Sequence, residues 1–315
     1  MALLGDRPVS VFEQGSFSVN PFKVQTSDAS RPPKELFIVT PIPKGLYPVL
    51  LFFHGTCLLN SSYSNILQHI SSHGYIVVAP QLYHGCLVPQ SNEVHSAGEV
   101  TNWLPTGLPS ILPDNVRANL DMLALSGHSR GGKTAFCLGL GYGNIDQCLK
   151  FKGLIGIDPV AGGMGVRWDP KILTYVPQSF DLGIPVCVYG SGLGSERQFV
   201  ILPACAPDGM NHSEFFRECK PPCSYFVAKD YGHMDLLDEG MANIGEFMCK
   251  SGQGCKKLLR KGVGGIVVAF FKACLEGKKT DFLAIVQNPD IAPIKLDPVT
   301  CIPENFSVNI IDVAM

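Results

Sequence analysis

The sequence predicts an α/β fold in which a mostly parallel central sheet carries helices on both faces. Two continuous apolar runs, 47–53 and 75–81, have the length and composition of strands buried on both sides. The segment 61–74 between them starts with serine, has apolar residues at helical spacing and ends in glycine, which indicates a helix. The order strand, helix, strand implies a right-handed crossover between parallel strands.

Later parts of the chain continue this pattern. We expect further strands at 9–25, 34–40, 122–125, within 151–163, 184–190 and 224–229, and a long helix at 264–277. No linker or internal repeat divides the 315 residues, so a single domain over 1–315 is expected. Residues 278–315 have a weak apolar pattern and are expected to pack on the outside as a C-terminal extension.

Residues 82–112 interrupt the alternation of strands and helices. Prolines and glycines recur there among apolar side chains, which is typical of a lid or a substrate-binding insertion above the edge of a sheet. The same stretch fits an ordinary helix, from about Asn92 to Leu104, with a loop on each side. The sequence leaves both interpretations open.

Composition excludes several classes of protein. The net charge is −2, so no field that would attract a nucleic acid is expected. No apolar run reaches the roughly 18 residues that a membrane-spanning helix needs. Residues 1–12 lack the basic flank and apolar core of a secretory signal, and also the Arg- and Ser-rich character of a transit peptide.

The chain has 12 cysteines, a high number for an intracellular enzyme. No pair has the CxxC spacing of a structural zinc site, so no metal site is expected. The cysteines in apolar surroundings are expected to be small core side chains: Cys57, Cys86, Cys137, Cys187 and Cys274. Those in loops rich in proline and glycine are candidates for one or two local disulfides of open pairing: Cys205, Cys219, Cys223, Cys249 and Cys255.

The strongest functional signal lies in residues 121–140. A short apolar strand is followed by the pentapeptide GHSRG at 127–131, and then by a segment with the pattern of a helix packed on a sheet. Strand, glycine turn, serine and helix make up the nucleophile elbow of α/β hydrolases. Small residues on both sides of the serine let strand and helix approach closely. A glycine-rich turn with a capping serine would explain one glycine and not three, so we interpret Ser129 as a nucleophile in an α/β-hydrolase fold.

A serine hydroxyl needs a base with a pKa near 7 and a third group that orients this base. In this fold the acid and then the histidine follow the serine along the chain. Of the two histidines after Ser129, His233 follows a predicted strand and His212 does not, which favours His233. For the acid, Asp158 lies at the tip of the strand after the elbow helix. Asp208 follows a later strand, where such an acid is commoner, and stays the alternative.

The tetrahedral intermediate of acyl transfer carries an oxyanion that needs two N–H donors. We expect one from Arg130, the residue after the nucleophile. We expect the other from Thr56, which follows His54 and Gly55 at the end of a buried strand. The side chains of His128 and Arg130 are expected to bond to neighbouring loops and not to take part in the chemistry.

Five stretches of the chain resemble the chlorophyllase family: 72–83, 125–136, 154–162, 211–219 and 227–238. They extend across most of the chain between about 35 and 275, and a generic lipase would not share all of them. The family carries its catalytic triad in the second, third and fifth stretches. The resemblance therefore implies Ser129, Asp158 and His233 as the triad, and favours Asp158 over Asp208.

The resemblance implies hydrolysis of the phytyl ester of chlorophyll to chlorophyllide and phytol through an acyl-enzyme. Magnesium belongs to this substrate, so no cofactor is expected. A long apolar leaving group and a flat ring need apolar walls, and position in the chain suggests five: Leu58, Leu59, Tyr83, Trp103 and Leu104.

Chlorophyll comes from a membrane, so the resemblance also implies peripheral membrane contact and the chloroplast. The cytosol and the endomembranes stay open because residues 1–12 show no clear targeting signal. Two other functions are compatible with the same fold: a general carboxylesterase or lipase, and a receptor that keeps the pocket without turnover. A complete triad argues against the receptor.

Overall fold

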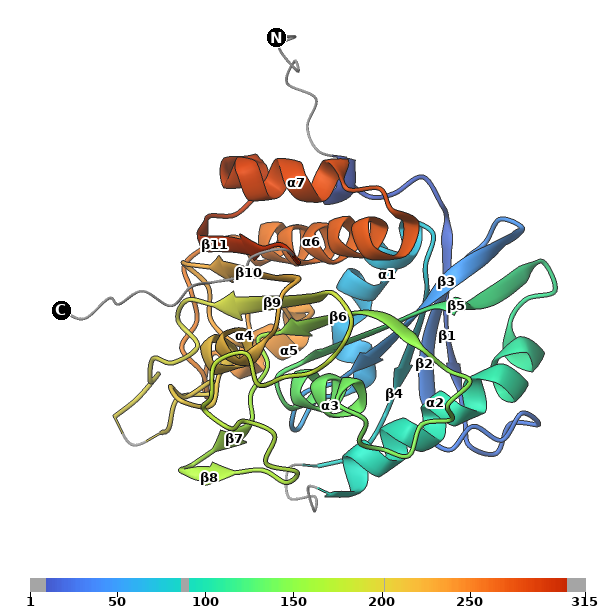
Figure 1. Cartoon of the computed structure of the whole chain (residues 1–315), viewed down its shortest axis with the longest axis horizontal. Coiled ribbons are helices and arrows are strands. Elements are labelled where there is room, and N and C mark those ends of the chain that lie inside the picture. The colour runs from blue at the N-terminus through green and yellow to red at the C-terminus, as the bar shows by residue number, and fades with distance from the viewer. Residues whose placement is uncertain (1–9, 86–90, 201, 305–315) are drawn as a thin grey trace, which may run out of the picture.

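The computed structural model of the chain describes residues 10–85, 91–200 and 202–304. Within these ranges it contains a nine-stranded sheet with the spatial order β1-β2-β4-β3-β5-β6-β9-β10-β11 (Figure 1). The strands are β1 (Val19–Val24), β2 (Leu36–Pro41), β3 (Gly45–Phe53), β4 (Ile76–Pro80), β5 (Val116–His128), β6 (Phe151–Ile157), β9 (Val186–Ser191), β10 (Cys223–Ala228) and β11 (Leu296–Ile302). A separate hairpin consists of β7 (Gly162–Gly163) and β8 (Val166–Arg167).

The middle of the sheet is parallel. Strands β4, β3, β5, β6, β9 and β10 pair in parallel, whereas β1, β2 and β11 join at the two sides through antiparallel pairs. The predicted α/β fold with a mostly parallel sheet is therefore confirmed. Because the central strands run in one direction, the loops that follow them meet at one edge, called here the carboxyl edge.

Helices cover both faces of the sheet. They are α1 (Ser64–Ser72), α2 (Ser91–Ile111), α3 (Arg130–Gly139), α4 (His212–Glu218), α5 (Glu239–Gly245), α6 (Lys256–Glu276) and α7 (Thr280–Gln287), with short 3-10 turns η1 (Ser10–Phe12), η2 (Asn60–Tyr63) and η3 (Pro289–Ile291). In Figure 1, α6 and α7 lie above the sheet and α2 and α3 below it.

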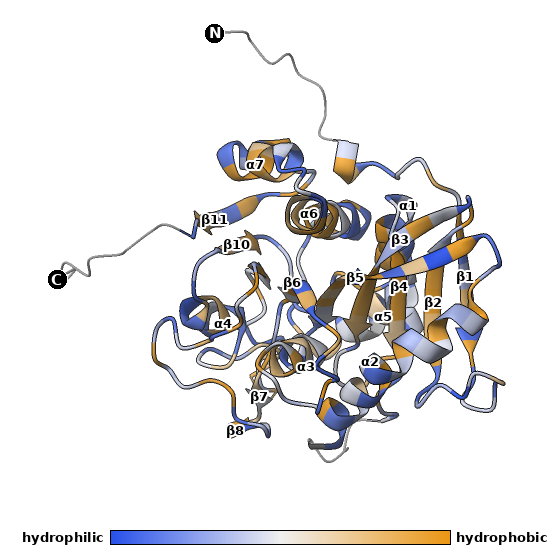
Figure 2. Ribbon diagram, turned by 45° about the vertical axis from the view of Figure 1, so that its right-hand side comes forward, coloured by the Kyte–Doolittle hydropathy of each residue, from blue (hydrophilic) through white to orange (hydrophobic). Residues whose placement is uncertain are grey.

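Two hydrophobic cores result, because successive side chains of a strand point to opposite faces. In β3, Leu51 belongs to the core shared with α2, α3 and α4, and Leu50 to the core shared with α1, α6 and α7. Figure 2 shows the central strands in mostly apolar colours between the helical layers. Burial on both faces explains why these strands are continuous apolar runs in the sequence.

The interrupting segment 82–112 contains a long helix. Residues 86–90 lie outside the described residues, and α2 then runs from Ser91 to Ile111, through Pro105 and Pro109. It extends seven residues beyond the predicted end at Leu104. A proline inside a helix costs about 3 kcal/mol, and the apolar face of α2 offsets this cost because it is buried in the core below the sheet.

The C-terminal segment contributes more to the sheet than its weak apolar pattern suggests. Besides α7 and η3, it supplies β11, which pairs antiparallel with β10 at the side of the sheet. Asp297 and Pro298 break the apolar alternation of this strand, which is tolerated at an edge. Residues 305–315 lie outside the described residues. Among the described helices, none has both the length and the apolar character needed to cross a bilayer.

Candidate active site

Five neighbouring strands bring the side chains of the candidate site to the carboxyl edge, among them Ser191, which the sequence analysis does not single out. His54 follows β3, Ser129 follows β5, Asp158 follows β6, and Ser191 ends β9. His233 follows β10 after a short turn. These strands are adjacent in the order β3-β5-β6-β9-β10, so side chains far apart in the sequence become neighbours.

Ser129 occupies the strained turn that the glycine pattern predicts. Its φ and ψ are 58° and −125°, and it is the N-cap of α3. A Cβ on Gly131 would lie 2.1 Å from the backbone oxygen of Phe53, and one on Gly127 would lie 2.3 Å from the oxygen of Gly131. Only glycine permits this approach of α3 to the sheet, so the turn holds Ser129 at the start of the helix, where the macrodipole favours negative charge.

Asp158 and His233 form a buried pair. The Nδ1–H of His233 donates to Oδ2 of Asp158 at 2.7 Å, and the hydroxyl of Ser191 donates to the same oxygen. Asp158 has a φ of 44°, an unusual value for a residue other than glycine, and is 0% exposed. Burial acts to raise the pKa of Asp158, but His233, His212 and Ser191 outweigh it and lower the pKa to about 2. The carboxylate therefore stays charged, and it holds the imidazole with Nε2 on the other side of the ring.

The other late histidine lies beside the same carboxylate. His212, the first residue of α4, has its Nε2 3.8 Å from Oδ1 of Asp158. Its Nδ1 lies 2.6 Å from the hydroxyl of Tyr225. Asp208, the alternative acid, accepts a bond from the amide of Asn211 in the turn before α4. The structure thus brings Asp158, and not Asp208, into contact with His233.

The loop 54–59, called here the oxyanion loop because the sequence analysis expects the Thr56 donor in it, is held by polar contacts on the side away from Ser129. His54 Nδ1–H donates to the carbonyl of Gly55 at 2.8 Å, and the N–H of Leu82 donates to His54 Nε2 at 3.0 Å. Burial lowers the pKa of His54 to about 4, so this ring stays neutral near pH 7. A Cβ on Gly55 would lie 3.1 Å from the Cβ of Ser129. The backbone before Thr56 therefore lies directly against the serine.

Arg130 links the elbow to other parts of the chain through its side chain. Its backbone N–H belongs to the first turn of α3, where N–H groups have no acceptor within the helix. Its guanidinium forms a buried ion pair with Glu93 of α2. The guanidinium carbon also lies 4.7 Å from the centre of the Tyr83 ring and 5.4 Å from that of Trp168. The sequence predicts bonds from this side chain to neighbouring loops, whereas its ion-pair partner lies on a helix and the rings of Tyr83 and Trp168 lie in loops.

The five predicted substrate walls separate into two groups. Leu58 is buried and Leu59 is 50% exposed in the oxyanion loop, and the buried ring of Tyr83 lies against His54 of this loop. Trp103 and Leu104 belong, together with Tyr83, to the core below the sheet, and the Trp103 indole donates to the backbone oxygen of Ser30. The structure does not bring these two residues to the site, because they lie on the face of α2 that packs on the strands.

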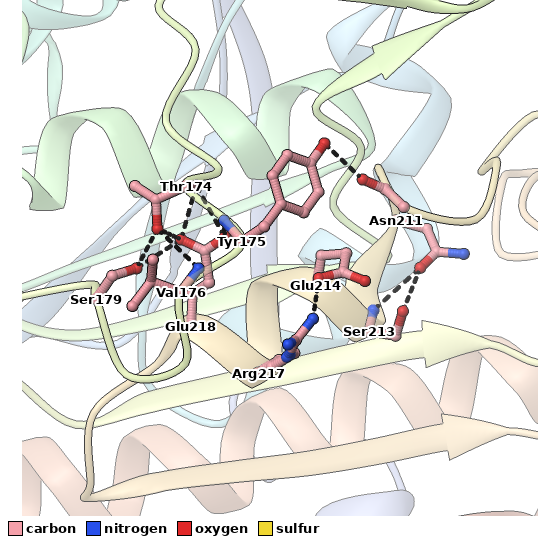
Figure 3. Close-up of polar contacts among 10 residues, drawn as sticks. Thr174, Tyr175, Val176, Ser179, Asn211, Ser213, Glu214, Arg217 and Glu218 are labelled. Carbon is pink, nitrogen blue, oxygen red and sulfur yellow. Dashed lines mark hydrogen bonds and ion pairs between the residues drawn. The ribbon is translucent and has the colours of Figure 1, made fainter.

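The segment between β8 and β9 is anchored by one buried carboxylate of α4. Figure 3 shows Thr174, Tyr175 and Ser179 gathered around Glu218. The carboxylate accepts bonds from the N–H groups of Thr174 and Tyr175 and from the hydroxyls of Thr174 and Ser179, at 2.5–3.0 Å. The Tyr175 hydroxyl donates to the carbonyl of Gly209. No sequence pattern predicts this anchor, which fixes the segment that carries Trp168.

The cysteines only partly follow the sequence prediction. A disulfide joins Cys205 and Cys249, which confirms a loop disulfide. The expectation for Cys57 as a core thiol is wrong, because it is exposed and disulfide-bonded. Cys219 and Cys223 are buried free thiols, not loop disulfides. Other outcomes are as follows: Cys137 and Cys187 are buried and free as expected, Cys274 is half-buried, Cys255 is free, and Cys86 lies outside the described residues.

The strand order, together with a nucleophile-elbow turn after β5, defines the chain as an α/β hydrolase. Comparison with known proteins narrows this class. The family model described as chlorophyllase matches residues 7–303. The chain is 48% identical to chlorophyllase-1 of Arabidopsis thaliana over 315 residues, covering 95% of this chain and 96% of that protein.

Two further relatives agree with this result. Chlorophyllase-1, chloroplastic, of Citrus unshiu is 47% identical and covers 94% of this chain and 90% of its own length. Chlorophyllase-2 of Arabidopsis thaliana is 44% identical, with 88% and 92% covered. The chain belongs to the chlorophyllase family.

Proposed function

We propose that this protein hydrolyses the phytyl ester of chlorophyll to chlorophyllide and phytol, with Ser129, Asp158 and His233 as its catalytic triad. The observation that carries the proposal is the 2.7 Å bond between His233 and Asp158, at the ends of strands beside the elbow of Ser129, in a member of the chlorophyllase family. The relatives are named as chlorophyllases, and two of them as chloroplastic, which supports the substrate and a chloroplast location.

In the first half of the reaction, Ser129 Oγ attacks the carbonyl carbon of the propionyl ester, and His233 Nε2 takes the serine proton. The charge of Asp158 stabilises the imidazolium and keeps the tautomer correct. Collapse of the tetrahedral intermediate breaks the bond to the phytyl oxygen, which receives the proton from His233 and leaves as phytol. An acyl-enzyme on Ser129 remains.

In the second half, water attacks the acyl-enzyme and gives its proton to His233. Collapse returns that proton to Ser129 and releases chlorophyllide as a carboxylic acid. In both halves the oxyanion would be held by the backbone N–H groups of Thr56 and Arg130. The position of Arg130 in the first turn of α3 and the contact of Gly55 with Ser129 support this assignment. All of these groups belong to the protein, and the reaction needs no further cofactor.

Apolar surface around the oxyanion loop suits the substrate. Leu58 and Tyr83 would form the inner wall, and Leu59, which is 50% exposed, the entrance. Further apolar side chains are exposed on two loops at the carboxyl edge that the Cys205–Cys249 disulfide joins: Phe199, Val200, Phe247 and Met248. We propose that they contact the membrane from which the substrate comes. Replacing Phe199 and Phe247 with serine should reduce co-sedimentation with galactolipid vesicles without changing hydrolysis of a water-soluble ester.

A fluorophosphonate probe and two substrates test the function. The intact protein should be labelled and should hydrolyse chlorophyll a faster than short p-nitrophenyl esters. Ser129→Ala should lose labelling and reduce kcat by about five to six powers of ten. Ser110→Ala, on the exposed face of α2, is the matched control and should behave as the wild type. A strong preference for the small esters would favour a general carboxylesterase, and an unlabelled intact protein would favour a receptor.

A further inference from the structure

A chain of buried hydrogen bonds connects the oxyanion loop, the elbow and the backbone of His233. The N–H of Gly55 donates to the Tyr63 hydroxyl at 2.9 Å, and this hydroxyl lies 2.9 Å from Nδ1 of His128. Nε2 of His128 lies 3.0 Å from the carbonyl oxygen of His233, which is 105 residues away in the sequence. Tyr63 and His128 are both 0% exposed, so no solvent competes for these bonds.

The donor and the acceptor of each hydrogen bond in this series follow from the groups at its two ends, the N–H of Gly55 and the carbonyl of His233. A carbonyl oxygen only accepts, so His128 must carry its proton on Nε2 and donate it to His233. In the neutral ring Nδ1 is then an acceptor, and the Tyr63 hydroxyl donates to it. The same hydroxyl accepts from Gly55, whose N–H can only donate. All three bonds are therefore satisfied together by one tautomer of neutral His128.

The surroundings of His128 keep the ring neutral. Burial, and after it the neighbouring His233, lower the pKa of His128 to about 3. The two rings lie against each other, with centroids 4.5 Å apart. A positive charge on His128 would repel the positive charge that His233 takes up in the proposed mechanism. A neutral partner instead leaves the proposed base free to become an imidazolium beside Asp158.

We propose that Tyr63 and His128 are positioning residues, which together hold the oxyanion loop and the backbone of the base in register with Ser129. The inference rests on the proposed function and adds to it. Tyr63 fixes Gly55, the residue before the Thr56 donor, and His128 fixes the main chain from which the imidazole of His233 projects. His128 is also the residue before Ser129. Two buried side chains therefore fix the positions of the oxyanion loop and of the main chain of His233 relative to the nucleophile.

The rate depends on the positions of the oxyanion loop and of His233 relative to Ser129, because a displacement of about 1 Å can lower the rate about a hundredfold. Tyr63→Phe removes both bonds of the hydroxyl and leaves the ring in place. His128→Gln keeps a donor near the position of Nε2 but loses the acceptor, whereas His128→Asn keeps an acceptor near Nδ1 but loses the donor to His233. Tyr63→Phe and His128→Gln therefore test the bonds towards Gly55, and His128→Asn tests the bond to the backbone of His233.

We expect each variant to lower kcat for a p-nitrophenyl ester by about ten- to a hundredfold, with KM within about twofold of the wild type. Tyr63→Phe and His128→Gln break the same link, so the double variant should be no slower than the slower single variant. Tyr63→Phe combined with His128→Asn should be slower than either single variant. A residue that merely supports the fold would not produce this pattern.

Tyr75→Phe is the matched control, because this buried tyrosine also loses a hydroxyl bond, to Glu276, away from the carboxyl edge. It should lower the melting temperature as much as Tyr63→Phe and leave kcat unchanged. The rate of fluorophosphonate labelling, measured on the folded fraction, gives a second readout. Wild-type kcat and labelling in Tyr63→Phe and His128→Asn would overturn the inference. A wild-type protein that is not labelled at all would instead overturn the proposed function.

Discussion

Glu93 of α2 and Arg130, the residue after Ser129, form an ion pair in which both side chains are buried. The pair joins the long helix of the interrupting segment directly to the elbow. Burial raises the pKa of Glu93 to about 7 from an ordinary value of 4.5, against the opposing effects of the charges on Arg130 and Lys133. The link between α2 and the elbow is therefore sensitive to pH.

Replacing Glu93 with glutamine should remove part of the pH dependence of stability. Because its pKa is higher in the folded state, Glu93 takes up a proton on folding between about pH 4.5 and 7. Its contribution to stability is thus greatest below pH 4.5 and is lost as the pH rises through 7. Urea unfolding at several pH values in this range should show a flatter profile for Glu93→Gln than for the wild type.

The exposed Glu99, on the same helix, provides the control for this experiment. Glu99→Gln should keep the wild-type profile. If Glu93→Gln unfolds with the same pH dependence as the wild type, Glu93 is charged throughout this range and the predicted coupling is absent.

Replacing Asp158 with asparagine should reduce kcat by about four powers of ten, because the amide favours the wrong tautomer of His233. The pKa of Asp158, about 2, is below its ordinary value of 3.8, so its stabilising effect is present above pH 3.8 and is lost as the pH falls towards 2. Asp158 is therefore charged between about pH 5 and 9, and its own titration adds no pH dependence to the wild-type kcat in this range. Hydrolysis of a p-nitrophenyl ester by the wild type and by Asp158→Asn measures the loss.

The same assay applied to Asp208→Asn tests the choice of acid. Asp208 bonds to Asn211 in the turn before α4, so this variant should keep its activity. An active Asp158→Asn together with an inactive Asp208→Asn would reverse the assignment.

Much of the fold could be predicted because its signals are local. The strands β3 and β4 appear as unbroken apolar runs, since both faces of each are covered by helices. The elbow appears as glycines around Ser129, since the close approach of α3 to β3 admits no side chain. The position of His233 after a predicted strand ranked it above His212, and the resemblance to the family ranked Asp158 above Asp208.

The remaining features depend on contacts between distant residues. The sequence does not show that Glu93 forms an ion pair with Arg130, or that Glu218 accepts hydrogen bonds from a segment some forty residues before it. The apolar face of α2 has the same composition whether it meets a substrate or a sheet, so the sequence does not show that Trp103 belongs to the core below the sheet. Cys57 was misassigned because its apolar neighbours in sequence do not reveal that its own side chain is exposed.

Adding a methyl group at Gly131 should strongly destabilise the protein. The new Cβ would lie 2.1 Å from the backbone oxygen of Phe53, and neither backbone can move without separating α3 from β3. We expect Gly131→Ala to lower the free energy of unfolding by at least about 3 kcal/mol, as measured by urea denaturation. Gly240→Ala is the control, because a Cβ there meets no atom within 4 Å. Equal stabilities of the two variants would show that α3 can move away from β3 at Gly131 without a large loss of stability.

Removing the Cys205–Cys249 disulfide should destabilise the part of the chain that carries the proposed base. The bond closes a loop with a sequence separation of 44, and this loop contains both His212 and His233. Cross-linking restricts the unfolded chain, so its loss should cost about 2–4 kcal/mol for a loop of this length. Cys249→Ser and Cys205→Ser should lower the melting temperature equally, and the double variant no further, because each removes the same bond.

Two comparisons make this prediction specific. Cys255→Ser removes an exposed free thiol from a nearby loop and should melt as the wild type does. Reductant should lower the melting temperature of the wild type more than Cys249→Ser alone does, because Cys57 is also disulfide-bonded and is reduced as well. A melting temperature of Cys249→Ser equal to that of the wild type would mean that the 44-residue loop is held by its packing and not by the disulfide.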